Sequence, residues 1–131
     1  MTTANADPDW AAPRRPLTPL ERQVITAVLS DDCPSVSELR RQLAAAQVSN
    51  TWPPSGSPSI DLYVPSAVPA APLDDGALPM NAYVYDADQN YLGELIVWIS
   101  DGRLSAIEYA WVTDHMPNSL PAAELVRVGR R

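Results

Sequence analysis

The sequence predicts an α+β fold, with an N-terminal αα-hairpin packed on one face of a mainly antiparallel β-meander sheet of about five strands. Three observations support this prediction. Apolar residues recur at helical spacing between residues 18 and 46, and at every second position in several segments from residue 48 onward. The pair Asp101-Gly102 separates two alternating runs, which is typical of a two-residue β-hairpin turn. At 131 residues the chain has the length of one domain.

The first helix is expected to begin at Pro19. Thr18 and Glu21 form the T-x-x-E pattern of a capping box, and proline suits the first helical position. One apolar stripe follows: Leu20, Val24 and Val28. Residues 1–16 are small, polar and rich in proline, which predicts a disordered arm before a single α+β domain at residues 17–128.

A second capping box, Ser35 to Glu38, predicts the start of the second helix. Its apolar stripe is Val36, Leu39, Leu43 and Ala46. Arg40 and Arg41 lie largely off this stripe, so a helix-turn-helix DNA reader is an alternative interpretation. The acidic balance of the chain and the presence of only two helices argue against it.

Alternation at period two predicts the strands of the sheet. They are expected near residues 48–52, 60–64, 82–85, 91–99 and 103–112, with a short one at 125–128. Prolines mark residues 53–58 and 65–79 as loops, because proline cannot donate a hydrogen bond to a ladder. Residues 129–131 are read as a basic tail.

The Asp101-Gly102 turn predicts the register of the last long hairpin. If Ser100 pairs with Arg103, Leu95 lies opposite Glu108 on one side of the sheet. The other side then holds the residues expected to bind a partner: Ile96, Trp98, Ile107, Tyr109 and Trp111, with Glu94 beside them. Two helices can cover only one side, so this aromatic side is a candidate binding surface. The alternative is that proline-rich loops or a second copy of the chain, as a homodimer, cover it.

Charge and composition indicate the kind of partner. The net charge is -7, and residues 51–126 contain ten acidic residues and a single basic one, Arg103. Such a segment repels nucleic acid and suits a basic protein. The longest strongly apolar run, Leu95 to Ile99, is too short to span a membrane, and a lone Cys33 excludes an internal disulfide. We therefore expect a cytoplasmic protein without cofactors.

No group of residues predicts catalysis or metal binding. Asp86, Asp88 and Asn90 match the first ligands of a calcium loop, but the rest of that motif is missing, and a hairpin turn with Asx hydrogen bonds explains them better. His115 follows Asp114 and is expected in a solvated loop, and Cys33 is expected to be structural. Glu108 is expected at the edge of the sheet or paired with an arginine of the second helix.

The chain resembles a group of small uncharacterised proteins of high-GC actinobacteria over residues 17–128. The resemblance rests on four segments: 17–22 (LTPLER), 36–43 (VSELRRQL), 59–62 (SIDL) and 101–108 (DGRLSAIE). Members of that group often have a cysteine-rich turn before the Ile-Asp-Leu strand, whereas this chain has 51–57 (TWPPSGS) there. No metal role therefore carries over, and the resemblance implies a fold without a known activity.

These observations together predict a non-enzymatic protein-binding module that uses an acidic sheet face with aromatic residues. An immunity-type or regulatory protein that neutralises a basic partner fits this description. The alternative is a small-molecule binder or an enzyme without a recognisable motif, with its pocket between the helices and the sheet.

Overall fold

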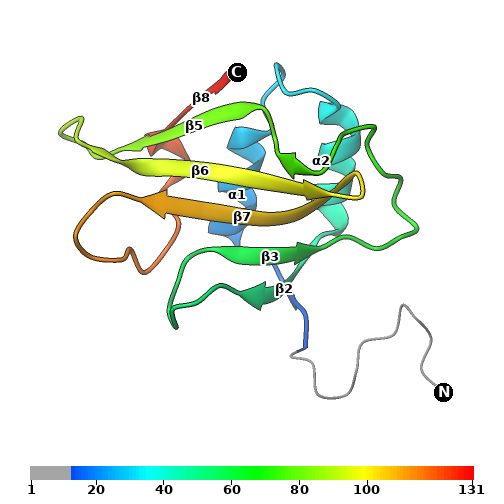
Figure 1. Cartoon of the computed structure of the whole chain (residues 1–131), viewed down its shortest axis with the longest axis horizontal. Helices are drawn as coiled ribbons and strands as arrows, with labels where there is room; N and C mark the ends of the chain where they lie inside the picture. The colour runs from blue at the N-terminus through cyan, green and yellow to red at the C-terminus, as the bar shows by residue number, and fades with distance from the viewer. Residues whose placement is uncertain (1–12) are drawn as a thin grey trace.

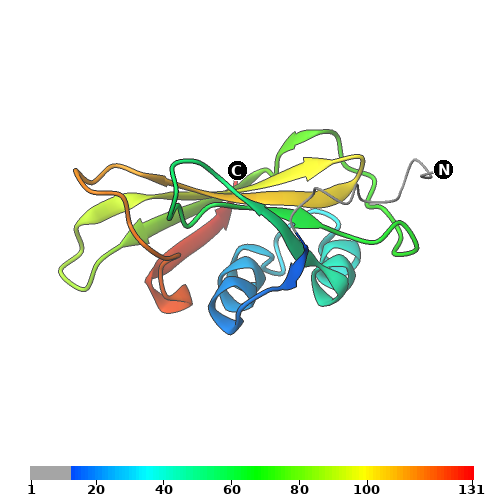
Figure 2. The same ribbon diagram turned by 90° about the horizontal axis from the view of Figure 1, so that it is seen from below.

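A computed structural model describes residues 13–131, so residues 1–12 of the arm expected at residues 1–16 lie outside them. Within the described part, two helices lie on one side of a large antiparallel sheet (Figures 1 and 2). The α+β class is confirmed. The sheet has eight strands, so the expectation of about five was wrong.

Helix α1 (Pro19–Val28) begins where its capping box predicts. The Glu21 N–H donates to Thr18 Oγ1 at 3.1 Å, and the Thr18 N–H donates to Glu21 Oε1 at 2.8 Å. Helix α2 (Val36–Ala45) begins differently, because Ser35 has a left-handed backbone with φ of 56° and its side chain makes no capping bond. The second capping box was therefore wrong, although the helix is present. No helix in residues 13–131 has the length and apolarity to cross a bilayer.

Two arginines fasten the ends of the helices to each other. Arg22 of α1 donates to the Leu43 carbonyl of α2 at 2.9 Å. Arg40 of α2 donates to the Leu29 carbonyl, at the C-cap of α1, at 3.0 and 3.2 Å, and to Asp31 at 2.9 Å. Free carbonyls at helix ends need such donors. Arg40 is thus engaged within the helical hairpin, which disfavours its use as a base-reading residue.

All paired strands in the sheet are antiparallel, in the order β1-β2-β3-β7-β6-β5-β8, with β4 also pairing with β6. The strands are β1 (Arg15–Pro16), β2 (Gln47–Thr51), β3 (Ile60–Tyr63), β4 (Gly76–Ala77), β5 (Met80–Tyr85), β6 (Tyr91–Ser100), β7 (Arg103–Trp111) and β8 (Val126–Arg130), and a 3-10 turn η1 (Ala123–Leu125) precedes β8.

The order of strands departs from a simple meander, because β3 lies beside β7. Strands β1 and β4 fall in segments expected to be an arm and a loop, and two residues are too few to show alternation. Strand β8 also extends to Arg130, so most of the expected tail is part of the sheet.

The β6–β7 hairpin follows the predicted register for two pairs and then departs from it. Ser100 lies opposite Arg103 and Ile99 opposite Leu104, and Asp101 and Gly102 both have positive φ, at 52° and 73°. A bulge at Ser105 then shifts the register by one residue. Because side chains alternate along a strand, this shift turns every later residue of β7 to the opposite face.

The bulge corrects the predicted facing of β7. Leu95 lies opposite Tyr109 rather than Glu108, and Glu108 lies opposite Ile96. In the shifted register Ile107 and Tyr109 enter the core between sheet and helices, with exposed fractions of 0% and 4%. The bulge is favoured because it buries the apolar Ile107 and Tyr109 in the core in place of the Glu108 carboxylate.

Candidate functional site

The side of the sheet opposite the helices, called here the outer face, is the candidate site. It is turned toward the viewer in Figure 1, and Figure 2 shows both helices on the other side. Alternation along the strands places a mixed set of aromatic, apolar and acidic side chains here, each half-buried or exposed: Trp52, Asp61, Tyr63, Tyr83, Tyr85, Tyr91, Glu94, Ile96, Trp98 and Glu108. Three of the six residues predicted from sequence, Glu94, Ile96 and Trp98, lie on it.

Trp98 and Glu108 form one hydrogen-bonded pair at the centre of this face. Trp98 is on β6 and Glu108 on β7, and Trp98 Nε1 donates to Glu108 Oε1 at 3.0 Å. Glu108 therefore pairs with an indole, not with an arginine of α2, and it lies on an inner strand of the sheet rather than an edge strand. The bond satisfies the polar atom of a half-buried tryptophan and fixes the orientation of its ring.

Trp52 and Asp61 form a second pair of the same kind. Trp52 follows β2, and its Nε1 donates to Asp61 Oδ1 at 2.8 Å. Asp61 lies opposite Ala106, which in turn lies opposite Trp98, so the two pairs occupy neighbouring strands. Sequence reasoning missed this pair. The alternation of Asp61 with buried Ile60 and Leu62 was the available signal that it faces away from the core.

The margins of the outer face carry arginines stacked on tyrosines. Arg127 lies over the Tyr85 ring at 4.1 Å, and Arg14 lies over the Tyr63 ring at 3.8 Å. Near Tyr85, the Tyr91 ring contacts both Tyr85 and Tyr83, with centroids at 5.6 and 6.2 Å. Burial, aided by the nearby Glu94 carboxylate, raises the pKa of Tyr91 above its ordinary value.

The acids of this face differ in their ionic partners. Glu94 lies 3.8 Å from Arg131. In the described part of the chain, neither Asp61 nor Glu108 has an arginine within ion-pair distance. The centre of the outer face is therefore acidic, while its margins are basic.

Three residues predicted for this surface lie elsewhere. Ile107 and Tyr109 are in the core, and Trp111 lies opposite Gly93 and packs against the core from its margin. The Tyr109 N–H donates to Ser59 Oγ at 2.9 Å, and burial raises the pKa of its phenol. The sequence register without the Ser105 bulge had turned these side chains to the wrong face.

A pocket between α1 and the sheet, with a volume of 430 Å³, corresponds to the alternative site considered from sequence. Arg15 and Glu21 line it, and two bonds of 2.9 Å join the guanidinium to the carboxylate. Burial would raise the pKa of Glu21, but the hydrogen bonds from Arg15 and the Thr18 N–H outweigh it and lower the pKa. Ser57, also in the lining, accepts from the Ser59 N–H at 3.2 Å. In the described structure no base is hydrogen-bonded to Ser57, so the pocket lacks an activated nucleophile.

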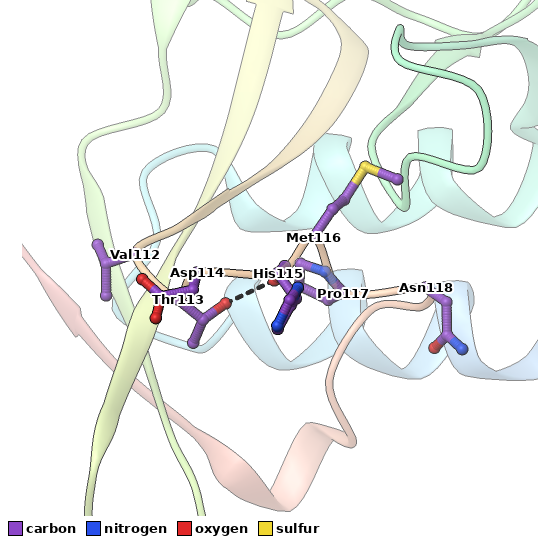
Figure 3. A pocket seen from close by; sticks show the side chains of 7 residues that line it. All are labelled: Val112, Thr113, Asp114, His115, Met116, Pro117 and Asn118. Carbon is purple, nitrogen blue, oxygen red and sulfur yellow. Dashed lines mark hydrogen bonds between the residues drawn. The ribbon is translucent and has the colours of Figure 1, made fainter.

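His115 lies in the exposed loop after β7, as expected. Figure 3 shows a shallow depression that seven consecutive residues line, from Val112 to Asn118. The only hydrogen bond drawn there runs from Thr113 Oγ1 to the His115 carbonyl, at 2.8 Å. Among the described residues no hydrogen bond joins the Asp114 carboxylate to the imidazole, so this loop offers no oriented base.

The two other segments singled out from sequence have structural roles. Asp86 Oδ1 accepts from the N–H groups of Asp88 and Asn90, both at 2.9 Å, and these bonds confirm the predicted Asx turn. The hydrogen bonds from Asn90 and Asp88 lower the pKa of Asp86. Cys33 is buried, and burial raises the pKa of its thiol above its ordinary value.

Comparison with family models, with curated proteins and with solved structures found no significant match to this chain. The resemblance to an actinobacterial group therefore stays a prediction, and the outer face has to be interpreted from its own chemistry.

Proposed function

We propose that the chain is a non-enzymatic binding module that docks a basic protein partner on the outer face of its sheet. The observation that carries this proposal is the placement of Trp98, Ile96 and the Trp52 ring on a side of the sheet that neither helix covers. Monomeric proteins rarely leave a large contiguous apolar surface without a use.

Charge supports a basic partner over a neutral one. Asp61 and Glu108 lie at the centre of the face without a described arginine partner, and residues 51–126 hold ten acidic residues against one basic residue. Opposite charge raises the rate of encounter, while buried aromatic anchors supply most of the affinity in many interfaces. An immunity-type or regulatory protein that blocks a basic enzyme would have these properties.

The test starts with affinity capture from a host lysate, followed by calorimetry on the purified, identified partner. We expect Trp98→Ala to raise the Kd at least about tenfold, and a higher salt concentration to raise it further. Gln23→Ala changes an exposed side chain of α1, on the opposite side of the sheet, so it should leave the Kd unchanged. Circular dichroism verifies that both variants are folded.

Capture of no basic protein contradicts this proposal, as does a purified partner whose Kd is the same for Trp98→Ala and wild type. Sedimentation of the free protein tests the homodimer. A dimer that Trp98→Ala dissociates would replace the basic partner with a second copy of the chain.

The second candidate function is small-molecule binding or catalysis in the 430 Å³ pocket beside Glu21. The buried carboxylate of Glu21 favours it, because buried acids are common in ligand sites. A ligand found by screening would support this candidate if it shifts the NMR signals of Glu21 and still binds the Trp98→Ala variant.

A further inference from the structure

We propose that the Trp98–Glu108 and Trp52–Asp61 pairs are receptors for two cationic side chains, arginine or lysine, spaced two residues apart on an extended segment of the partner. This inference rests on the proposed function above, and it adds what the partner must present.

Each pair combines an aromatic ring with a fixed carboxylate. The indole N–H occupies one carboxylate oxygen, Glu108 Oε1 or Asp61 Oδ1, and no hydrogen bond from a described residue reaches the second oxygen. A guanidinium over the ring can therefore donate to that second oxygen while it contacts the π face. Because the indole bond already orients both groups, little ordering is needed on binding.

The chain itself stacks an arginine on an aromatic ring at both margins of the outer face. Arg127 stacks on Tyr85, and Arg14 stacks on Tyr63. At the centre, two aromatic rings with adjacent acids have no described cation beside them, although Glu94, farther along the same face, has Arg131. The arrangement at the centre is complete except for the cations, which a partner would supply.

The spacing of the two pairs specifies what the partner presents. Asp61 lies opposite Ala106, and Glu108 is two residues farther along β7, so the two acids are diagonal neighbours. Diagonal neighbours on adjacent antiparallel strands are about 7–8 Å apart. Side chains two residues apart on an extended segment share one side and are roughly 7 Å apart. An Arg-x-Arg or Lys-x-Lys segment therefore matches the two pairs, whereas adjacent basic residues point to opposite sides.

The experiment is an NMR titration of the ¹⁵N-labelled protein that follows the indole N–H signals. These signals are assigned with Trp52→Phe and Trp98→Phe. The probes are two blocked peptides of the same composition, Gly-Ser-Arg-Ser-Arg-Ser-Gly and Gly-Ser-Ser-Arg-Arg-Ser-Gly, and a version of the first with glutamine for arginine. We expect the first peptide to shift both indole signals and to bind about 5-fold more tightly than the second, and the glutamine peptide to cause no shift.

Asp61→Asn and Glu108→Gln remove one charge each but keep an oxygen that can accept the indole hydrogen bond. Each variant should lower the affinity for the first peptide at least about 3-fold, and the double variant should lower it at least about 10-fold. Asp114→Asn makes the same change of charge in the exposed loop after β7 and should leave the affinity unchanged. It controls for the general effect of net charge.

Equal affinity for the two arginine peptides would refute the predicted spacing of the two cations. Indoles that shift as much with the glutamine peptide as with the first peptide would show that no cation is needed. The outcome for the protein partner separates the two proposals. If Trp98→Ala lowers the affinity for that partner but Asp61→Asn and Glu108→Gln do not, the docking face is supported and the cation receptors are refuted. If none of the three variants lowers this affinity, both proposals fail.

Discussion

Replacement of Gln42 by leucine is expected to lower the free energy of unfolding by about 3 kcal/mol. Gln42 is on α2, has an exposed fraction of 0%, and makes three hydrogen bonds to the sheet and its loops. Its Nε2 donates to the Pro69 and Gly102 carbonyls at 3.1 and 2.9 Å, and its Oε1 accepts from the Leu104 N–H at 2.9 Å. These bonds join the second helix to the β6–β7 hairpin.

The magnitude follows from what each partner retains in the variant. The Gly102 carbonyl also accepts from the Ala71 N–H at 2.8 Å, and the exposed Pro69 can take water instead. Leu104 is 1% exposed and lies beyond the last β3–β7 pair, so its N–H is left without an acceptor. One unsatisfied buried donor costs about 1–3 kcal/mol, and each of the two other lost bonds about 0.5–1.5 kcal/mol. Leucine is close to glutamine in volume, which limits the cavity.

Urea denaturation followed by tryptophan fluorescence and by circular dichroism measures this change. Gln23→Leu, at an exposed position of α1, is the matched control and should change stability by less than about 0.5 kcal/mol. A loss below about 1 kcal/mol for Gln42→Leu, or a loss equal to that of the control, would refute the reasoning that these bonds hold the helix to the hairpin.

Two further predictions concern α1 and the β6–β7 ladder. Because hydrogen bonds from Arg15 and Thr18 lower the pKa of Glu21, its contribution is complete above the unfolded pKa of about 4.3 and is lost as the pH falls through the lower folded value. Glu21→Gln should therefore lower the unfolding free energy by about 1 kcal/mol at pH 7 and by less near pH 3, and an undiminished difference in urea titrations at the lower pH would contradict this. Gly93 has φ of 146°, and a Cβ there would overlap the Ala110 carbonyl, so Gly93→Ala should cost more than about 2 kcal/mol in thermal unfolding. A Cβ at Gly129 meets no atom within 4 Å, so Gly129→Ala should be nearly neutral, and equal losses for the two variants would be evidence against the steric explanation.

Features that depend on a few neighbouring residues could be predicted from the sequence. The Thr18–Glu21 capping box, the Asp101-Gly102 turn and the Asx turn at Asp86 are each complete within five residues, and each has the predicted geometry. The α+β class followed from periodicity, since spacing along one chain decides which side chains can share a face. Trp98 and Ile96 were placed correctly for the same reason.

The face of β7 was decided only by tertiary structure. The local sequence gives no sign of the bulge at Ser105. The bulge nevertheless places Ile107 and Tyr109 in the core and turns Glu108 to the outer face. That exchange gains buried apolar surface against the helices and releases a carboxylate to Trp98.

The remaining differences also depend on distant partners. Strands β1 and β4 exist only because β2 and β6 offer them free backbone groups. The Trp52–Asp61 pair forms because the β2–β3 pairing places a residue after β2 beside β3. The sequence by itself thus determined the two helices, the longer strands and the Asp101-Gly102 and Asp86 turns. Which side chains meet on the outer face was decided by long-range packing, because a shift of one residue in a strand reverses every side chain beyond it.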